Sequence, residues 1–80
     1  MKSTILLQIY RGYAMYSHEQ IREIIRKTPA QFKGMPIKAL RTAILVGRRK
    51  DPDTQQIYTI YDHYIGNDKI YFVVANGKIL

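Results

Sequence analysis

The chain has 80 residues, of which 46% are hydrophobic and 24% are charged, and it contains no cysteine. This composition is typical of one small globular domain and excludes disulfide bonds and cysteine-based zinc sites. The net charge of +7 indicates a polyanionic partner, and no apolar run approaches the ~20 residues that a transmembrane helix needs. We therefore expect a soluble cytoplasmic protein that does not bind membranes.

The first part of the chain predicts a strand followed by a helix. Residues 5–10 are rich in β-favouring side chains and are expected to form a buried strand, which Gly12 to Tyr16 connect to the helix. Ser17 and Gln20 have the spacing of a capping box, and Thr28-Pro29 ends the helix at residue 27 or 28. The apolar stripe of this helix consists of Ile21, Ile24 and Ile25.

A second helix-start pattern follows at once. Thr28-Pro29-Ala30-Gln31 predicts a capping residue and one short helical turn through Phe32, closed by Gly34. Residues 42–49 are expected to form a strand, in which Gly47 marks a bulge or a close approach of another backbone. Residues 37–41 fit either a strand or a helical turn.

The remaining residues predict a meander of strands separated by turns. Asp51 to Thr54 have strong turn chemistry, and Asn76-Gly77 is a strong hairpin signal. Between them, residues 56–65 and 69–75 are expected to form strands on either side of a turn at Gly66 to Asp68. The order β-α-(short α)-β-β-β predicts an α+β fold, in which one antiparallel-rich sheet packs against one principal helix.

Two assumed turns assign the side chains of this meander to two faces. We assume that Asp51 to Thr54 form a two-residue hairpin and that the second turn centres on Asn67, with regular alternation along each strand. The more apolar face, which the helix is expected to cover, carries Ala43, Leu45, Tyr58, Ile60, Asp62, Tyr64, Ile70, Phe72 and Val74. The second face, expected to be open or covered by a partner, carries Thr42, Ile44, Val46, Arg48, Ile57, Thr59, Tyr61, His63, Tyr71 and Val73.

Basic and aromatic residues on and around the second face are the candidate binding residues. Residues 1–50 hold eleven Lys and Arg residues but only two acidic ones. Lys and Arg bind phosphates, and tyrosines on an open sheet can stack on unpaired bases. The candidates are Lys38, Arg41, Arg48, Arg49, Lys50, Tyr61 and Tyr71. In the alternative interpretation, these charges only keep the domain soluble, and Arg49 and Lys50 neutralise Asp51 and Asp53.

Three functional hypotheses follow. The leading one is a nucleic-acid-binding module, and the second is a protein–protein interaction module that inhibits or regulates an acidic or nucleic-acid-binding partner. The third is a metal-free ribonuclease that uses His63, Arg48 and Tyr61, since bacterial toxin ribonucleases share this order of elements. No cofactor or metal motif is present, so we expect a binding protein rather than an enzyme. A homodimer could form through an edge strand.

Overall fold

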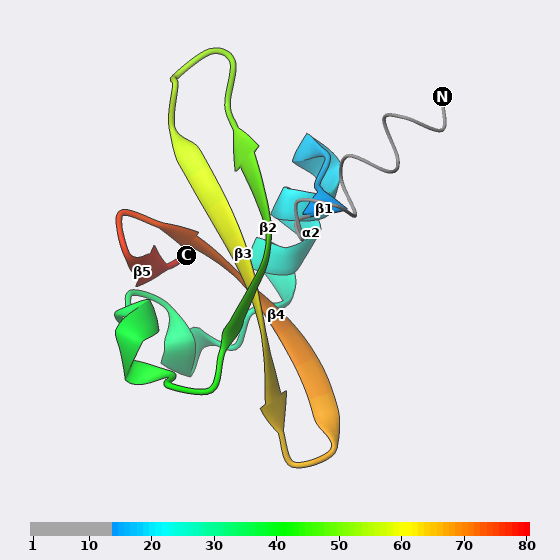
Figure 1. The fold of residues 1–80 in the computed structure, drawn as a ribbon, viewed down its shortest axis with the longest axis vertical. Coiled ribbons are helices and arrows are strands. Elements are labelled where there is room, and N and C mark those ends of the chain that lie inside the picture. Colours follow the sequence, from blue (N-terminus) through cyan, green and yellow to red (C-terminus); the bar gives the residue numbers. More distant parts are fainter. Residues whose placement is uncertain (1–13) are drawn as a thin grey trace.

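The computed structural model describes residues 14–80, which form one α-helix, two 3₁₀ turns and a five-stranded sheet (Figure 1). The helical elements are α2 (His18–Lys27), η1 (Ala30–Phe32) and η2 (Ile37–Ala39). The strands are β1 (Ala14–Met15), β2 (Ile44–Lys50), β3 (Ile57–Ile65), β4 (Asp68–Ala75) and β5 (Lys78–Ile79). Their order in the sheet is β1-β2-β3-β4-β5, and only the β1–β2 pair is parallel. The predicted α+β fold is thereby confirmed.

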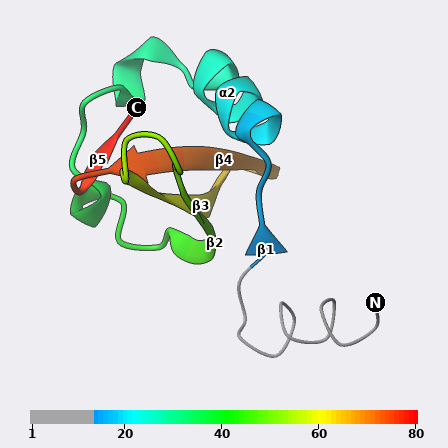
Figure 2. The same ribbon diagram turned by 90° about the horizontal axis from the view of Figure 1, so that it is seen from above.

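Only part of the sequence before α2 belongs to the described residues. The strand predicted over residues 5–10 lies outside the described residues. Ala14–Met15, predicted as part of a connection, instead pairs with Gly47 and Arg48 as the edge strand β1. Seen from above, the chain runs from β1 at one edge of the sheet to α2, which lies beside β4 (Figure 2). The helix therefore lies over β4, three strands away from the edge strand β1 that precedes it.

Helix α2 begins where its sequence predicts. Ser17 Oγ accepts a hydrogen bond from the backbone N–H of Gln20 at 3.1 Å, and Gln20 Oε1 accepts one from the Ser17 N–H at 2.8 Å. These two bonds satisfy backbone donors that have no partner inside the helix. Ile21 on the first turn is buried against the sheet, so the cap also sets the position of the apolar stripe.

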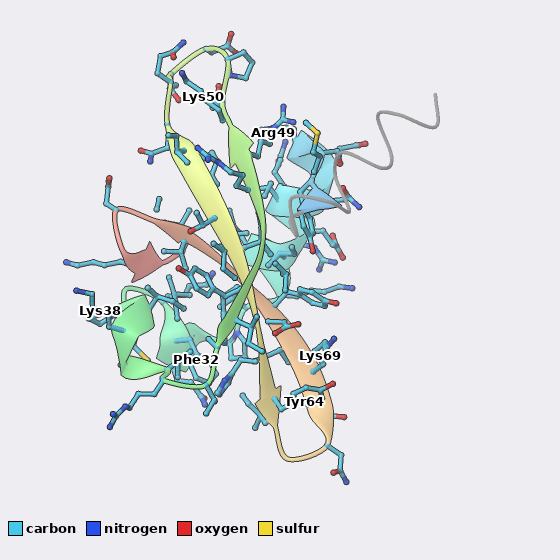
Figure 3. All side chains as sticks on the ribbon, viewed as in Figure 1. Phe32, Lys38, Arg49, Lys50, Tyr64 and Lys69 are labelled. Atoms are coloured by element: carbon cyan, nitrogen blue, oxygen red, sulfur yellow. The ribbon has the colours of Figure 1, made fainter. Side chains whose placement is uncertain are left out.

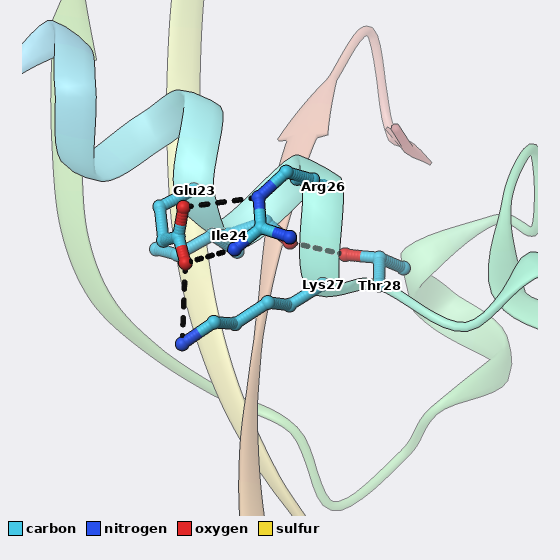
Figure 4. A network of polar contacts seen from close by, with 5 residues as sticks. All are labelled: Glu23, Ile24, Arg26, Lys27 and Thr28. Atoms are coloured by element: carbon cyan, nitrogen blue, oxygen red, sulfur yellow. Dashed lines mark hydrogen bonds and ion pairs between the residues drawn. The ribbon is translucent and has the colours of Figure 1, made fainter.

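The end of α2 differs in one respect from the prediction. Thr28, expected to cap the following turn, is instead the C-cap residue of α2. Its N–H donates to the Ile25 carbonyl at 3.2 Å, and its hydroxyl donates to the carbonyl oxygen of Ile24 at 2.7 Å. Arg26 and Lys27 both bind the carboxylate of Glu23 one turn earlier (Figure 4). The η1 turn then starts after Pro29, which has no side-chain cap.

The sheet carries an apolar cluster on each of its two faces. We call the side of Tyr58, Ile60 and Val73, which α2 covers, the helix face. We call the side of Thr59, Tyr61 and Phe72, on which η1 and η2 lie, the turn face. In Figure 1, α2 is to the right of the crossing strands and the two 3₁₀ turns are to the left. Both faces are therefore covered in part, and the second predicted face is not an open surface.

The two clusters contain different residues. The helix-face cluster consists of buried Ile21, Ile60 and Val73 with half-buried Tyr16, Ile24, Ile25, Val46, Tyr58 and Leu80. The turn-face cluster consists of buried Phe32, Phe72, Val74 and Ile79 with half-buried Met35, Ile37, Leu40, Tyr61 and Ile70. The prediction that α2 packs on Tyr58 and Ile60 is correct, whereas Phe32, Ile70, Phe72 and Val74 lie on the other face.

The first hairpin has a longer loop than assumed. The Asp51 N–H donates to the Gln56 carbonyl at 2.8 Å and the Gln55 N–H donates to the Asp51 carbonyl at 2.9 Å, so residues 52–55 form a four-residue loop. The Asp51 carboxylate accepts the N–H groups of Asp53 and Thr54 at 2.8 and 3.3 Å. Because the loop is longer by two residues, the alternation of β2 relative to β3 near this loop is unchanged.

The second hairpin is displaced by one residue, and this displacement exchanges the faces of β4. Ile65 pairs with Asp68, so the turn contains only Gly66 and Asn67. Gly66 has a φ of 63°, a conformation that favours glycine in a two-residue hairpin loop. A shift of one residue moves every side chain of a strand to the opposite face. The predicted grouping of Tyr61 with Tyr71 is therefore wrong: Tyr61 lies opposite Phe72.

A β-bulge between Leu45 and Gly47 confirms the interpretation of Gly47. It also changes the face on which the residues of β2 before the bulge lie. Gly47 lies opposite Ile60 and Leu45 lies opposite Tyr61, so Val46 is the extra residue. Such an insertion reverses the alternation beyond it. Leu45 consequently lies on the turn face instead of the predicted helix face.

Candidate nucleic-acid interface

Strand β2 distributes the basic run Arg48-Arg49-Lys50 over both faces of the sheet. Arg48 lies opposite Thr59 and Lys50 lies opposite Ile57, which places these side chains on the turn face. Arg49 lies opposite Tyr58, on the helix face. The three consecutive cations therefore do not form one patch, and only Arg48 and Lys50 belong to the same surface.

Arg48 and Lys50 are exposed, and no ion pair among residues 14–80 neutralises either charge. The three ion pairs within residues 14–80 join Glu23 to Arg26 and Lys27, and Asp62 to Lys69. Asp51, which follows Lys50 directly, uses its carboxylate to accept backbone N–H groups of its own loop. The structure thus gives no support to neutralisation of Lys50 by Asp51.

Arg49 has a contact that explains its position on the helix face. Its Nη1 donates to the backbone carbonyl oxygen of Tyr16 at 3.2 Å, and the side chain is half-buried. Tyr16 is the residue between β1 and the helix cap at Ser17. Arg49 consequently ties the entry of α2 to β2, a role that leaves its guanidinium less available to a partner.

Lys38 and Arg41 lie on the segment that covers the turn face. Both are exposed, whereas Ile37 and Leu40 on the same segment pack into the turn-face cluster. Figure 3 shows Lys38 beside the 3₁₀ turns at the lower left and Lys50 near the top of the first hairpin. The candidate cations of the turn face therefore form two groups along the strand direction rather than one compact cluster.

The two candidate tyrosines occupy opposite faces and different environments. Tyr61 is half-buried in the turn-face cluster, so its ring packs against the protein's own apolar side chains. Tyr71 lies opposite Asp62 on the helix face and is 40% exposed. The predicted combination of Arg48 with two stacking tyrosines on one surface is not present.

His63 is on the turn face but is separated from Arg48. Its Nδ1 lies 3.2 Å from Thr42 Oγ1, and its ring centre is 6.3 Å from that of Phe72. Arg48 lies opposite Thr59, four residues away along β3, or about 13 Å at ~3.3 Å per residue. The structure therefore does not bring the imidazole and the guanidinium together as a ribonuclease site would require.

A cluster on the helix face was missed by the sequence reasoning. Lys69 Nζ lies 3.4 Å from Asp62 Oδ2 and 5.7 Å from the centre of the Tyr64 ring. Burial, and then the neighbouring Tyr71 and Asp62, raises the pKa of the Tyr16 hydroxyl. The Tyr64 hydroxyl, and then the contact with Asp62, raises the pKa of Lys69. The signal in the sequence was Asp62, the one charged residue on a predicted apolar face.

This helix-face cluster differs in chemistry from the turn face. Asp62 balances the charge of Lys69, and the raised pKa of Tyr16 keeps that hydroxyl protonated at neutral pH. The helix-face cluster therefore presents aromatic rings and hydroxyls without net positive charge. It offers no free cation to which a phosphate would bind.

Comparison with known proteins assigns no family to this chain. No protein-family model, no curated protein and no solved structure matches it. Within residues 14–80, no three His, Asp or Glu side chains are grouped in a way that could hold a metal ion. None of the helical elements in that part of the chain has the length and apolar character needed to cross a membrane. Inferences about function consequently depend on the surfaces described above.

Proposed function

We propose that this protein binds nucleic acid through the turn face, where Arg48 and Lys50 contact phosphates and Lys38 and Arg41 extend the contact along the strand direction. One observation carries the proposal. Arg48 and Lys50 are exposed side by side on one face, and none of the ion pairs within the described residues neutralises them. A polyanion would supply the negative charges that the protein itself does not place there.

The surroundings of these cations favour backbone binding over base recognition. Tyr61 is packed into the turn-face cluster and Tyr71 lies on the other face, so neither offers a stacking surface beside Arg48. Exposed Ile57 is the apolar neighbour of Lys50 on this surface. Contacts of this kind fix phosphates and sugars, which carry no sequence information directly. The proposed activity is therefore binding with little sequence preference.

Binding through phosphates has a measurable salt dependence. Each phosphate contact to a duplex contributes about −0.9 to the slope of log affinity against log salt concentration. Fluorescence anisotropy with a labelled duplex of mixed sequence, and with the corresponding single strand, measures this slope. Replacing both Arg48 and Lys50 with Ala is expected to reduce its magnitude by about 2 and to weaken binding at every salt concentration.

A charge-matched variant is the control. Arg26→Ala with Lys27→Ala removes the same two charges from α2, where both side chains bind Glu23. This control is expected to keep most of the slope, since those cations are already neutralised in part. Equal losses in the two double variants would show that only net charge matters and would contradict a site on the turn face. Absence of salt-dependent binding in the wild type would favour a protein partner instead.

A further inference from the structure

Within the described part of the chain, the outer edge of β4 is unpaired over most of its length. Strand β3 pairs with residues 68–74 of β4, whereas β5 on the other side reaches only Val74 and Ala75. The Leu80 N–H then donates to the Val73 carbonyl at 2.9 Å. Among residues 14–80, no backbone group pairs with residues 68–72 on this side. In Figure 1 this half of β4 is at the lower right, away from β5.

The backbone groups that face this edge can be identified. In an antiparallel strand, the N–H and C=O of one residue point to the same side, and successive residues alternate. The Val73 carbonyl points away from β3, because it accepts from Leu80. Lys69 and Tyr71 therefore direct their N–H and C=O groups outward, while Asp68, Ile70 and Phe72 pair with β3. The edge offers two donors and two acceptors.

We propose that a second copy of this chain pairs with this edge, antiparallel and in one register. A two-fold axis at Ile70 places Lys69 opposite the partner's Tyr71 in both directions, which forms four backbone hydrogen bonds. It also places the aliphatic part of the Lys69 side chain next to the partner's Tyr71 ring, an apolar contact across strands. The interface is isologous, because each copy contributes the same residues.

Two neighbouring registers are excluded by the same edge. An axis at Tyr71 would place Lys69 opposite the partner's Val73, whose carbonyl already accepts the N–H of Leu80. An axis at Lys69 would place the two Lys69 residues opposite each other, and like charges in that position are destabilising. Only the register centred on Ile70 therefore uses all the outward groups without a clash of charge.

The other edge of the sheet, formed by β1 and β2, is protected against pairing with a second copy. Natural sheets protect edges with bulges, very short strands and charged side chains, above all lysine. Strand β2 has a bulge, and its outer neighbour β1 has two residues. Lys69 on β4 is also charged, but its ammonium is paired with the carboxylate of Asp62 on β3 at 3.4 Å. Its charge is directed away from the edge and leaves the backbone groups accessible.

Pairing of this kind has a consequence for the surface of the assembly. A two-fold axis perpendicular to the sheet leaves the turn faces of both copies on the same side. Arg48 and Lys50 of the two copies then belong to one extended face. The dimer does not depend on nucleic-acid binding, and the two can be tested separately.

Sedimentation equilibrium of the full chain without nucleic acid tests the proposal. Over about 1 μM to about 1 mM protein, the apparent mass is expected to rise from 9.4 kDa toward twice that value. The dimer is expected to tighten as salt screens the repulsion between two chains of net charge +7, whereas nucleic-acid binding weakens. A mass that stays at one chain throughout would overturn the proposal.

A pair of proline variants locates the interface. Tyr71→Pro removes an outward N–H that β3 does not use, and proline is tolerated at such edge positions. It is expected to raise the dimer dissociation constant at least about tenfold. Tyr64→Pro is the matched control, because Tyr64 lies on the same face of the same hairpin with its N–H directed away from β4. Equal dimerisation of Tyr71→Pro and the wild type would contradict this edge.

Hydrogen exchange of the wild type keeps the proposal testable if Tyr71→Pro does not fold. The amides of Lys69 and Tyr71 are expected to gain protection as the protein concentration rises. Protection that is already complete in the dilute monomer would mean that another segment of the same chain occupies the edge, and the proposal would be wrong.

Discussion

The two faces of the sheet are covered in different ways. The turn face is covered by a segment with little regular structure, which is held by backbone hydrogen bonds from Gly34 to Ile79, from Ile37 to Gly77 and from Ile79 to Met35, at 2.6, 2.9 and 2.9 Å. The helix face is covered by one amphipathic helix, which contacts the sheet through its isoleucines. Irregular segments can therefore enclose a core when a neighbouring strand satisfies their backbone groups.

Emptying the turn-face cluster is expected to have the largest effect on stability. Phe72 is fully buried, and its ring centre is 5.0 Å from that of Phe32. Phe72→Ala is expected to lower the free energy of unfolding by about 3–5 kcal/mol, a large share of the ~4–12 kcal/mol typical of 80 residues. Urea denaturation followed by circular dichroism measures the loss. Ile44→Ala, at a residue 62% exposed on β2, is the control and is expected to change stability by less than about 0.5 kcal/mol.

Removing the cap of α2 is expected to have a smaller effect that is confined to the helix face. Ser17→Ala removes the oxygen that accepts the Gln20 N–H and is expected to cost about 1 kcal/mol. Hydrogen exchange should accelerate in the first turn of α2 while the Ile79 amide, bonded to Met35, stays protected. Ser17→Asp restores an acceptor and is expected to recover the stability. Equal acceleration on both faces would show that the two coverings are not independent.

The smallest expected effect concerns the exposed pair of Glu23 with Arg26. Hydrogen bonds from Arg26, and then from Lys27, lower the pKa of Glu23 below its ordinary value of 4.5. A carboxyl with a lowered folded-state pKa stabilises the protein above its unfolded-state pKa, and this contribution is lost as the pH falls through the lowered value. An NMR titration of the Glu23 side chain is expected to show this shift and its reduction in Arg26→Gln. An unchanged titration in that variant would contradict the pairing.

Local signals were sufficient wherever one short pattern decides the geometry. The capping box at Ser17 and Gln20 and the turn at Asn76-Gly77 were read correctly, since each depends on backbone groups within a few residues. Asn76 and Gly77 both have positive φ values, 54° and 79°, as a two-residue hairpin loop of this sequence requires. The α+β class followed from the order of these local elements.

The candidate site was predicted only in part, because its geometry depends on register. A displacement of one residue at Gly66-Asn67 moved Tyr71 to the helix face, and no local preference distinguished the two turns strongly. The assignment of Arg48 to the side of Thr59 survived, because the longer loop after Asp51 added an even number of residues. The covering of the turn face by η1 and η2 involves contacts between distant segments, which no local pattern records.

The amino-acid sequence by itself determined the charge, the positions of α2 and of strands β2, β3 and β4, and the alternation within β3 and β4, because these depend on composition and on neighbouring residues. The tertiary structure decided which faces the strands share, that Arg49 binds Tyr16 while Arg48 and Lys50 remain exposed, and that the edge of β4 lacks a neighbour over residues 68–72 of the described chain. Those outcomes depend on strand pairing, in which a shift of one residue reverses every side chain.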